Sequence, residues 1–195
     1  REMFDTKLRA LRRERAARQG PELFLLERAF ADGLERLELI RREFADALLV
    51  GCPDPGWRER LAALAGSVVA TEDLETLAPQ SFDLVLAVGT LDTANELQLA
   101  LRGYFEALRP GGLFLGALAG GETLPLLRRV MAAADRVSGG ASPRIHPRIE
   151  AAMLAPLLEQ AGFVRPVVDV DRVEVAYSSL DRLVADLRGM AATNS

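Results

Sequence analysis

Short apolar runs alternate with helical stripes through the middle of this chain. The run at 47–50 is uninterrupted and ends in glycine, which is typical of a strand buried on both faces of a parallel sheet. Strands of this kind are predicted at 47–50, 68–70, 82–88 and 113–118. The segments 57–65 and 96–108 between them have the character of helices, with Gly66 as a cap for the first. The pattern therefore predicts parallel strand–helix–strand units with right-handed crossovers.

The two ends of the chain have a different pattern. Residues 3–46 predict two helices separated by Gly20-Pro21, and further helices are predicted at 124–137, 149–160 and 179–188. Two strand-like runs, 163–170 and 172–177, are separated by almost nothing, so we expect them to pair as an antiparallel hairpin.

The fold class that these elements predict is α/β. We expect an open sheet of about six strands, parallel except for the last, with the C-terminal hairpin included. The domain is expected over 47–195. Residues 1–46 form a helical extension that packs on it, because its apolar stripe is too large to leave in water.

Composition narrows the classes of function. Hydrophobic residues make up 49% of the chain and charged residues 27%, the balance of a globular protein. The net charge of -4 argues against nucleic acid as a partner, and no apolar run approaches the roughly 18 residues of a membrane span. Cys52 is the single cysteine, which excludes an intrachain disulfide and favours a reducing, cytoplasmic location. One histidine and one cysteine give no metal-ligand spacing and no hydrolytic triad.

The turn GCPDPG, residues 51–56, follows the first predicted strand. Cofactor-binding turns at this position carry glycines because the backbone must adopt positive φ and approach the ligand closely. Pro53 and Pro55 have φ fixed near -65° and no N–H to donate. The position of the turn therefore predicts a cofactor site, whereas its composition argues against tight binding.

Several longer motifs are similar to a known family. FDLVLAV, LRPGGLFLGAL and EQAGF, in this order after a glycine turn, resemble the class I S-adenosylmethionine-dependent methyltransferases. FDTKLRALRRERAAR, GALAGGETLPLLRR, GGASPRIHP and DLRGMAATNS resemble one branch, which includes the complex I assembly factor reported as an arginine hydroxylase. The biotin-pathway malonyl-carrier methyltransferases are more distantly similar. The resemblance covers almost the whole chain and implies a Rossmann-like methyltransferase fold with S-adenosylmethionine as cofactor. It also suggests that residues could follow Ser195.

Three departures from the family pattern concern the cofactor. The family's opening segment resembles ALDLGCGRG, and without a gap Leu49 stands where its acid belongs, with Pro53 and Pro55 where two glycines belong. Residues 57–81 hold one helix and one strand where the family has two of each, so the strand whose acid holds the ribose is predicted to be missing. The strand at 68–70 should then lie beside the first. After 82–88 the family has a segment like SLSLHWVND, whose histidine and tryptophan are absent here.

The resemblance implies cofactor contacts from a small set of residues: Gly51, Gly56, Glu72, or Asp73 in its place, and the backbone of Thr90 and Leu91. On the substrate side it points to Glu122, Arg144 and His146, each with a plainer alternative. Glu122 also suits the first turn of the following helix, where a carboxylate meets the positive end of the helix dipole. Arg144 also fits a solvated loop arginine, and His146 a structural histidine.

Two functions follow from these observations, and both stay open at this stage. The first is a methyltransferase-like protein whose affinity for S-adenosylmethionine is weak or absent, with any catalysis resting on alignment of the reactants. The second is a non-catalytic binding or assembly factor that uses the fold as a scaffold for a protein partner. A third, the hydroxylase activity reported in the family, lacks a recognisable iron-ligand set in this sequence. The methyl acceptor and the oligomeric state are not specified by any motif.

Overall fold

This computed structural model describes residues 4–73, 76–140 and 148–192, and the structural statements below refer to these residues. The chain divides into two compact units. The larger comprises 24–119 and 152–168, and the smaller comprises 1–23, 120–151 and 169–195. Each unit is described by itself. The sequence-based division at residue 46 stays a prediction.

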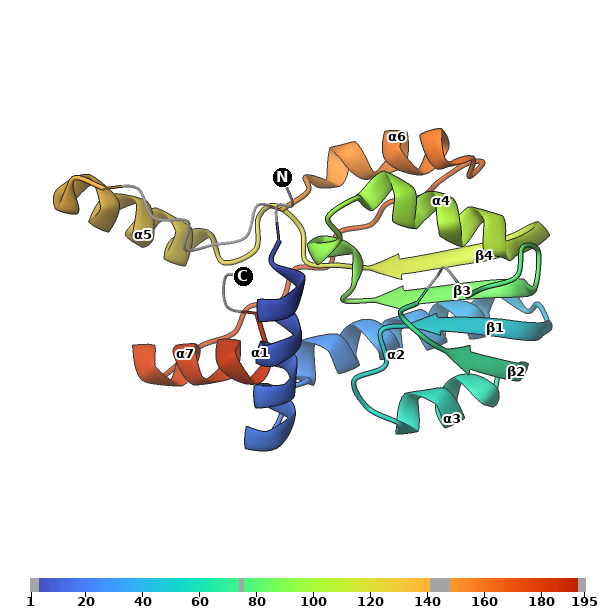
Figure 1. Cartoon of the computed structure of the whole chain (residues 1–195), viewed down its shortest axis with the longest axis horizontal. Helices are drawn as coiled ribbons and strands as arrows, with labels where there is room; N and C mark the ends of the chain where they lie inside the picture. Colours follow the sequence, from blue (N-terminus) through green and yellow to red (C-terminus); the bar gives the residue numbers. More distant parts are fainter. Residues whose placement is uncertain (1–3, 74–75, 141–147, 193–195) are drawn as a thin grey trace. The chain divides into compact units, whose positions relative to one another are not determined.

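The larger unit is built on a parallel sheet of four strands (Figure 1). Its strands are β1 (Phe44–Val50), β2 (Ala65–Ala70), β3 (Phe82–Val88) and β4 (Leu108–Ala117), in the order β2-β1-β3-β4. Val68 of β2 lies opposite Ala47 of β1, which confirms the predicted neighbour of the first strand. The prediction of about six strands is wrong.

The difference in strand number lies in the expected C-terminal hairpin, which is absent from the described structure. Residues 163–177 form no strand, and the side chains of Val164 and Val167 are 84% and 89% exposed. An isolated two-stranded ribbon is marginal in water unless an apolar face is covered, and Pro166 cannot donate to a ladder. The two halves of the expected hairpin also belong to different compact units. Valine content and short spacing were therefore not sufficient for pairing.

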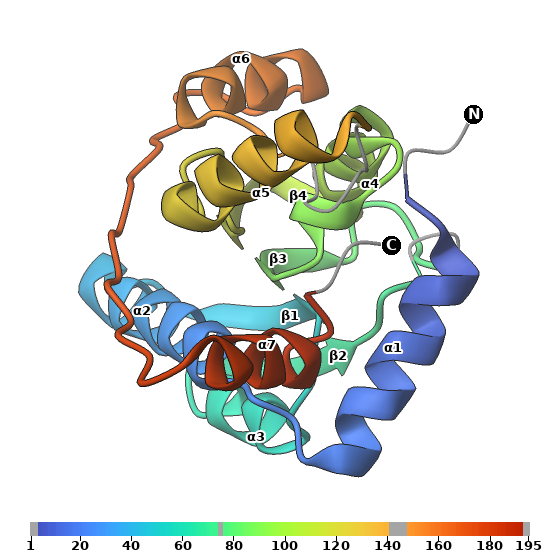
Figure 2. The same ribbon diagram turned by 90° about the vertical axis from the view of Figure 1, so that its left-hand side faces the viewer.

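Helices cover both faces of the sheet in the larger unit (Figure 2). They are α2 (Phe24–Ile40), α3 (Gly56–Ala62), the short 3-10 helix η1 (Leu91–Thr93), α4 (Leu97–Ala107) and α6 (Ala151–Ala161), the last without its first residue. Leu49 packs with α2 and α3 on one face, whereas its neighbours Leu48 and Val50 pack with α4 on the other. Successive strand residues point to opposite faces, and burial on both faces explains the unbroken apolar runs.

Gly66 was predicted to cap the helix after the turn, and this is wrong. Helix α3 ends at Ala62, and Gly66 lies within β2. A Cβ atom at Gly66 would come within 2.9 Å of the carbonyl oxygen of Ala45 in β1. The glycine therefore permits the close approach of two strands, and this use leaves no mark in a sequence pattern.

Helices α2 and α3 are joined through one carboxylate and one aromatic stack. The rings of Phe30 and Trp57 stack with centroids 4.3 Å apart. Trp57 donates its indole N–H to Glu27 Oε2 at 2.7 Å, and Arg60 donates to Glu27 Oε1 at 2.5 Å. Trp57 is fully buried, so its indole N–H needs this acceptor. The contacts fix the start of α3, which follows the turn at 51–56.

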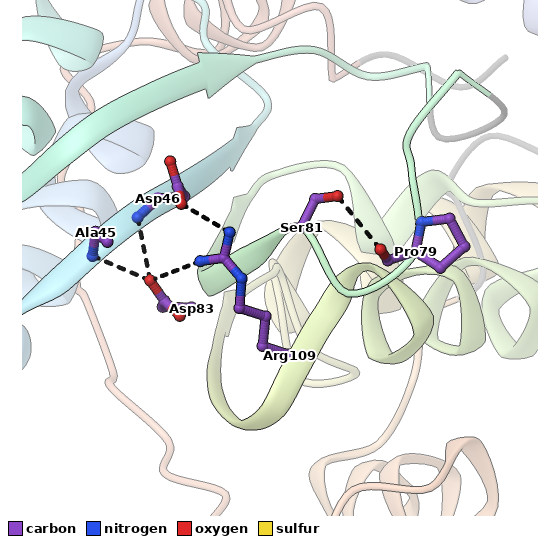
Figure 3. A network of polar contacts seen from close by, with 6 residues as sticks. All are labelled: Ala45, Asp46, Pro79, Ser81, Asp83 and Arg109. Atoms are coloured by element: carbon purple, nitrogen blue, oxygen red, sulfur yellow. Dashed lines mark hydrogen bonds and ion pairs between the residues drawn. The ribbon is translucent and has the colours of Figure 1, made fainter.

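The amino ends of the strands are joined by a polar network (Figure 3). Asp83 of β3 accepts hydrogen bonds from the backbone N–H groups of Ala45 and Asp46 in β1, at 3.0 and 3.2 Å. Arg109 of β4 contacts Asp46 Oδ2 at 2.8 Å and Asp83 Oδ2 at 3.0 Å. Burial opposes ionisation of Asp83, but the hydrogen bonds from Arg109 and the two amides hold the pKa of this carboxyl below its ordinary value.

The RPGG segment in β4 places Arg109 within reach of the two acids. Leu108 pairs with Phe82 and the next pair is Leu113 with Leu84, so residues 109–112 leave the ladder as an irregularity. Gly111 has φ of +76°, which glycine adopts without strain. The sequence pattern predicted a strand over 113–118. The structure instead starts the strand at Leu108 and interrupts it.

The smaller unit contains α1 (Thr6–Gln19), α5 (Pro125–Ser138) and α7 (Leu180–Gly189). Asp5 caps α1 by accepting from the N–H of Leu8 at 2.9 Å. Helix α1 packs against α7, and the two lie side by side in Figures 1 and 2. No residue of α5 is buried.

The network at the amino ends predicts a pH-dependent contribution to stability. Asp83→Asn should lower the free energy of unfolding at pH 7 by about 1 kcal/mol, because it removes the charge that pairs with Arg109. The pKa of Asp83 is lowered in the folded state, so its contribution is present above the unfolded pKa of about 4 and is lost as pH falls through the folded value. Urea unfolding of both proteins between pH 7 and pH 2 measures the difference, which should shrink below about pH 4.

Asp32→Asn is the matched control. Asp32 pairs with Arg36 at 2.7 Å on the exposed side of α2, where both side chains are about half exposed. Its replacement should change the unfolding free energy by a few tenths of a kcal/mol at most. Equal effects of the two substitutions at pH 7 would contradict a special role for Asp83.

Candidate functional site

The carboxyl ends of β1, β2 and β3 meet at one edge of the sheet. In the ladder Leu49 lies opposite both Ala70 and Leu86, and the N–H of Thr71 donates to the carbonyl of Leu49 at 3.1 Å. The chain leaves β1 toward β2 on one side, and β3 lies on the other, so the strand order reverses at β1. Ligands of open α/β sheets bind in the crevice at such a switch point. The candidate site is therefore formed by the segments 51–56, 71–73 and 89–93.

Gly51 is required by the packing of two of these segments against each other. It has φ of +81°, and a Cβ atom there would collide with the carbonyl oxygen of Val88 and come within 2.7 Å of the Thr90 methyl group. Any side chain would therefore separate the turn after β1 from the turn after β3. This need for glycine holds with or without a bound ligand. The predicted cofactor role of Gly51 stays a prediction.

Asp54 binds the backbone amides at the end of the turn at 51–56. Asp54 accepts from the N–H of Gly56 through Oδ1 at 2.8 Å, and its carbonyl accepts from the N–H of Trp57 at 3.1 Å. Pro53 and Pro55 have no N–H. Gly56 is the first residue of α3, so its amide is engaged by Asp54 rather than directed at the crevice. Sequence reasoning missed Asp54, although an aspartate two residues before a glycine is a recognised turn signal.

Cys52 is a packed thiol within the same turn. Its Sγ donates to the carbonyl of Asp54 at 3.2 Å, and the side chain is partly buried beside the core that includes Trp57. Burial raises the pKa of the Cys52 thiol. The thiol therefore stays protonated at neutral pH, which agrees with a packing role for this residue.

Leu49 stands at the position where the first strand of the family carries an acid, and the surroundings of this side chain are apolar. Leu49 is fully buried and packs among the side chains of α2 and α3, where no carboxylate could be directed into the crevice. Glu72 lies just past β2, at the carboxyl end of the strand beside β1. It is exposed, and this is the place expected for an acid that binds ribose hydroxyls. Its role as a cofactor ligand remains untested.

A buried phenol lies behind the segment after β3. Tyr104 of α4 is buried, its ring stacks on Phe114 with centroids 5.6 Å apart, and its hydroxyl lies near Thr90. Burial raises the pKa of Tyr104, the nearby Thr90 side chain lowers it, and the charge of Glu72 raises it again, so that the net shift is upward. The phenol is therefore neutral at physiological pH, and the Thr90 hydroxyl is buried without a hydrogen-bond partner in the described part of the chain. Sequence reasoning missed Tyr104 because it falls on the apolar stripe of its helix.

Leu91 and Thr90 occupy different environments although they are adjacent. Leu91 is buried in the cluster with Leu48 and Val50, so it can offer a ligand only backbone atoms. Thr90 is half-buried between Gly51 and Tyr104. The structure thus brings together Gly51, Thr90 and Leu91 of the predicted cofactor set, with Glu72 close enough for its charge to affect Tyr104.

The predicted substrate residues belong to the smaller unit or lie outside the described residues. Glu122 pairs with Arg172 at 2.6 Å, and both side chains are exposed. The residue that caps α5 is Leu124, which makes no side-chain hydrogen bond, so the capping role suggested for Glu122 is wrong. Arg144 and His146 fall in the segment 141–147, outside the described residues, and their assignments stay predictions.

The described residues contain neither a cluster of metal ligands nor a helix that could span a membrane. No group of three or more histidine, cysteine, aspartate or glutamate side chains within them is arranged to hold a metal ion. None of the described helices is both long and apolar enough to cross a membrane.

Comparisons with known proteins agree on one family. Residues 48–116 match the family described as "Methyltransferase domain". The arginine-hydroxylase NDUFAF5 of Danio rerio is 39% identical over 67% of this chain and 41% of its own length. The Mus musculus protein of the same name is 31% identical over 98% of this chain and 64% of its own length. The malonyl-[acyl-carrier protein] O-methyltransferase of Xylella fastidiosa is 35% identical over 71% of this chain and 44% of its own length.

The solved structures to which the chain is similar include methyltransferases of low sequence identity. The N-methyltransferase NodS of Bradyrhizobium japonicum, in complex with S-adenosylhomocysteine, is 17% identical over 69% of this chain and 74% of its own, with a TM-score of 0.47. The alignments to the mouse and zebrafish proteins span 64% and 41% of those proteins, so the chain corresponds to part of their length. Taken with the parallel sheet and the glycine turn at its switch point, these matches show that the chain carries a methyltransferase domain and is a homologue of the NDUFAF5 and malonyl-carrier O-methyltransferase proteins.

Proposed function

We propose that the larger unit is a methyltransferase domain with a degenerate cofactor site, which binds S-adenosylmethionine weakly or not at all. The observation that carries the proposal is the turn at 51–56. Two of its positions lack an N–H, and the amides of Gly56 and Trp57 are taken by Asp54. A cofactor with a carboxylate and ribose hydroxyls needs donors and acceptors from this turn and from the neighbouring strand ends.

The losses are large on the scale of cofactor binding. Hydrogen bonds to charged groups contribute roughly 1.5–3 kcal/mol each, so two missing ones weaken binding on the order of a hundredfold or more. Leu49 supplies no acceptor, and the carboxylate of Asp54 adds a negative charge to the turn itself. The residues of this turn therefore do not fit the usual set of cofactor contacts.

Some features of a binding site are retained. Gly51 keeps the turns after β1 and β3 in contact, Glu72 follows the strand beside β1, and the Thr90–Leu91 backbone borders the crevice. We assign residual affinity to these groups. If methyl transfer occurs, it rests on alignment of donor and acceptor, because attack on a sulfonium needs little beyond orientation and, for some acceptors, a base.

A second candidate function is a binding or assembly factor that uses the domain as a scaffold. It is favoured by the combination of a turn whose Gly56 amide is bound by Asp54 and the similarity to NDUFAF5 along nearly the whole chain. In this function the partner is a protein, and cofactor affinity is absent rather than reduced. Titration of the cofactor separates the two candidates.

Isothermal titration with S-adenosylmethionine and S-adenosylhomocysteine tests the degenerate site. We expect no saturable heat in the micromolar range for the unmodified protein. The variant Pro53→Gly/Asp54→Ala/Pro55→Gly frees the turn amides and leaves the buried Leu49 in place, and it should bind more tightly than the unmodified protein. Its thermal unfolding must remain cooperative for the comparison to count.

Leu39→Ser is the matched control, because Leu39 is exposed on α2 and lies outside the turn at 51–56. This change should leave the titration unchanged. Micromolar binding by the unmodified protein would show that the turn is competent and that the proposal of weak binding is wrong. No gain in the triple variant would locate the defect at Leu49 or at the missing strand, and would favour the scaffold function.

The buried phenol gives a separate prediction at alkaline pH. Tyr104→Phe should change the free energy of unfolding at pH 7 by less than about 1 kcal/mol, because the Thr90 hydroxyl is buried without a hydrogen-bond partner among the described residues and the substitution keeps the ring that stacks on Phe114. The pKa of Tyr104 is raised in the folded protein, so its contribution is present below the unfolded pKa of about 10 and is lost as pH rises through the folded value. Urea unfolding from pH 7 to pH 11 should show a steeper loss of stability for the unmodified protein than for the variant. Burial also raises the pKa of Tyr177, the other tyrosine, which is half-buried, so both proteins should carry Tyr177→Phe in this comparison.

A further inference from the structure

Helix α5 has two distinct sides although none of its residues is buried. On one side Leu126, Val130 and Val137 are 69%, 54% and 90% exposed. These positions are four and seven residues apart, so they lie along a single face of the helix. Large apolar side chains aligned in this way are unusual on a surface that meets only water.

The other side of α5 is basic. The helix contains Arg128, Arg129 and Arg136 against a single acid, Asp135. At 100° per residue Arg129 and Arg136 border the apolar face on one side, and Arg128 lies on the opposite side of the helix. Arg128 also donates to the carbonyl of Thr123 at 3.0 Å. The helix therefore carries positive charge in a protein whose net charge is -4.

The boundaries of α5 are defined by its own sequence. Pro125 begins the helix and needs no N–H partner there, and Gly139 ends it with φ of +71°. A helix of 14 residues is marginal in water by itself, and it gains stability when its apolar face is covered.

We propose that α5 docks on an anionic lipid surface, lying in the plane of the interface with its apolar face toward the acyl chains. An apolar face with arginine along one border and on the opposite side is the pattern of interfacial helices, because the long arginine side chains can extend to the headgroups while the apolar residues insert. Two copies of α5 packed face to face would bring these arginines together, so charge disfavours a second copy as the occupant. The proposal does not depend on whether the larger unit binds a cofactor.

Vesicle flotation with the full chain tests the docking. The probes are vesicles of pure phosphatidylcholine and vesicles of phosphatidylcholine with about 30% phosphatidylglycerol, at low and high salt. We expect flotation with the anionic vesicles, little with the neutral ones, and a decrease with salt. Val130→Asp/Val137→Asp should reduce binding to anionic vesicles by about tenfold or more, and Arg129→Gln/Arg136→Gln should weaken it and remove much of the salt dependence.

Leu39→Asp is the matched control, since Leu39 is 81% exposed on α2 and lies outside α5. It should leave flotation unchanged. Failure to float with anionic vesicles, or equal flotation of Val130→Asp/Val137→Asp, overturns the proposal. A fall of several degrees in the melting temperature of that variant without lipid would show that the face packs within the protein, which also overturns it. A dimer in light scattering that the same variant dissociates would assign the face to a second copy instead.

Discussion

The parallel pairing of β1 with β3 is the interaction on which the rest of the structure depends. Both strands are buried on both faces, so their backbone groups have no alternative partner in water. At the amino ends Asp83 binds the β1 backbone, and at the carboxyl ends Gly51 lets the two turns meet. The helices then cover a sheet whose two central strands are already fixed at both ends. The candidate site lies where the turns after β1 and β3 contact each other, on the side that faces the solvent.

This arrangement separates two demands on the same turn. Closure of the β1 turn on β3 requires one glycine, whereas recognition of a cofactor requires further free amides. Gly51 meets the first demand, and on the function proposed above the second is not met, because Asp54 and two prolines restrict the entry to α3. Stabilised local structure and a binding-competent backbone are then alternatives at this turn.

Sequence reasoning predicted the elements whose pattern is strong and local. The runs at 47–50 and 82–88 and the amphipathic helices were identified. The inference that one strand of the family is missing also led to the correct prediction that β2 lies beside β1. Contacts between residues far apart in the chain could not be predicted from these local patterns. The hairpin failed because valine content does not supply a covering face, and Gly66 was misassigned because its contact with Ala45 joins distant segments. Tyr104 was hidden because a buried tyrosine has the same periodicity as a leucine, and Arg144 and His146 remain predictions.

The hydrogen bond from the Gly56 amide to Asp54 also limits how the turn can change over time. A carboxylate already bound at the start of α3 acts as a built-in competitor, so replacing a single proline by glycine would leave the amide occupied. Removing Asp54 alone would leave two positions without a donor. Neither step offers an intermediate with improved binding, and selection for a cofactor could not easily act on one substitution at a time. On the proposed loss of cofactor binding, the turn therefore makes a return to binding by successive point mutations difficult.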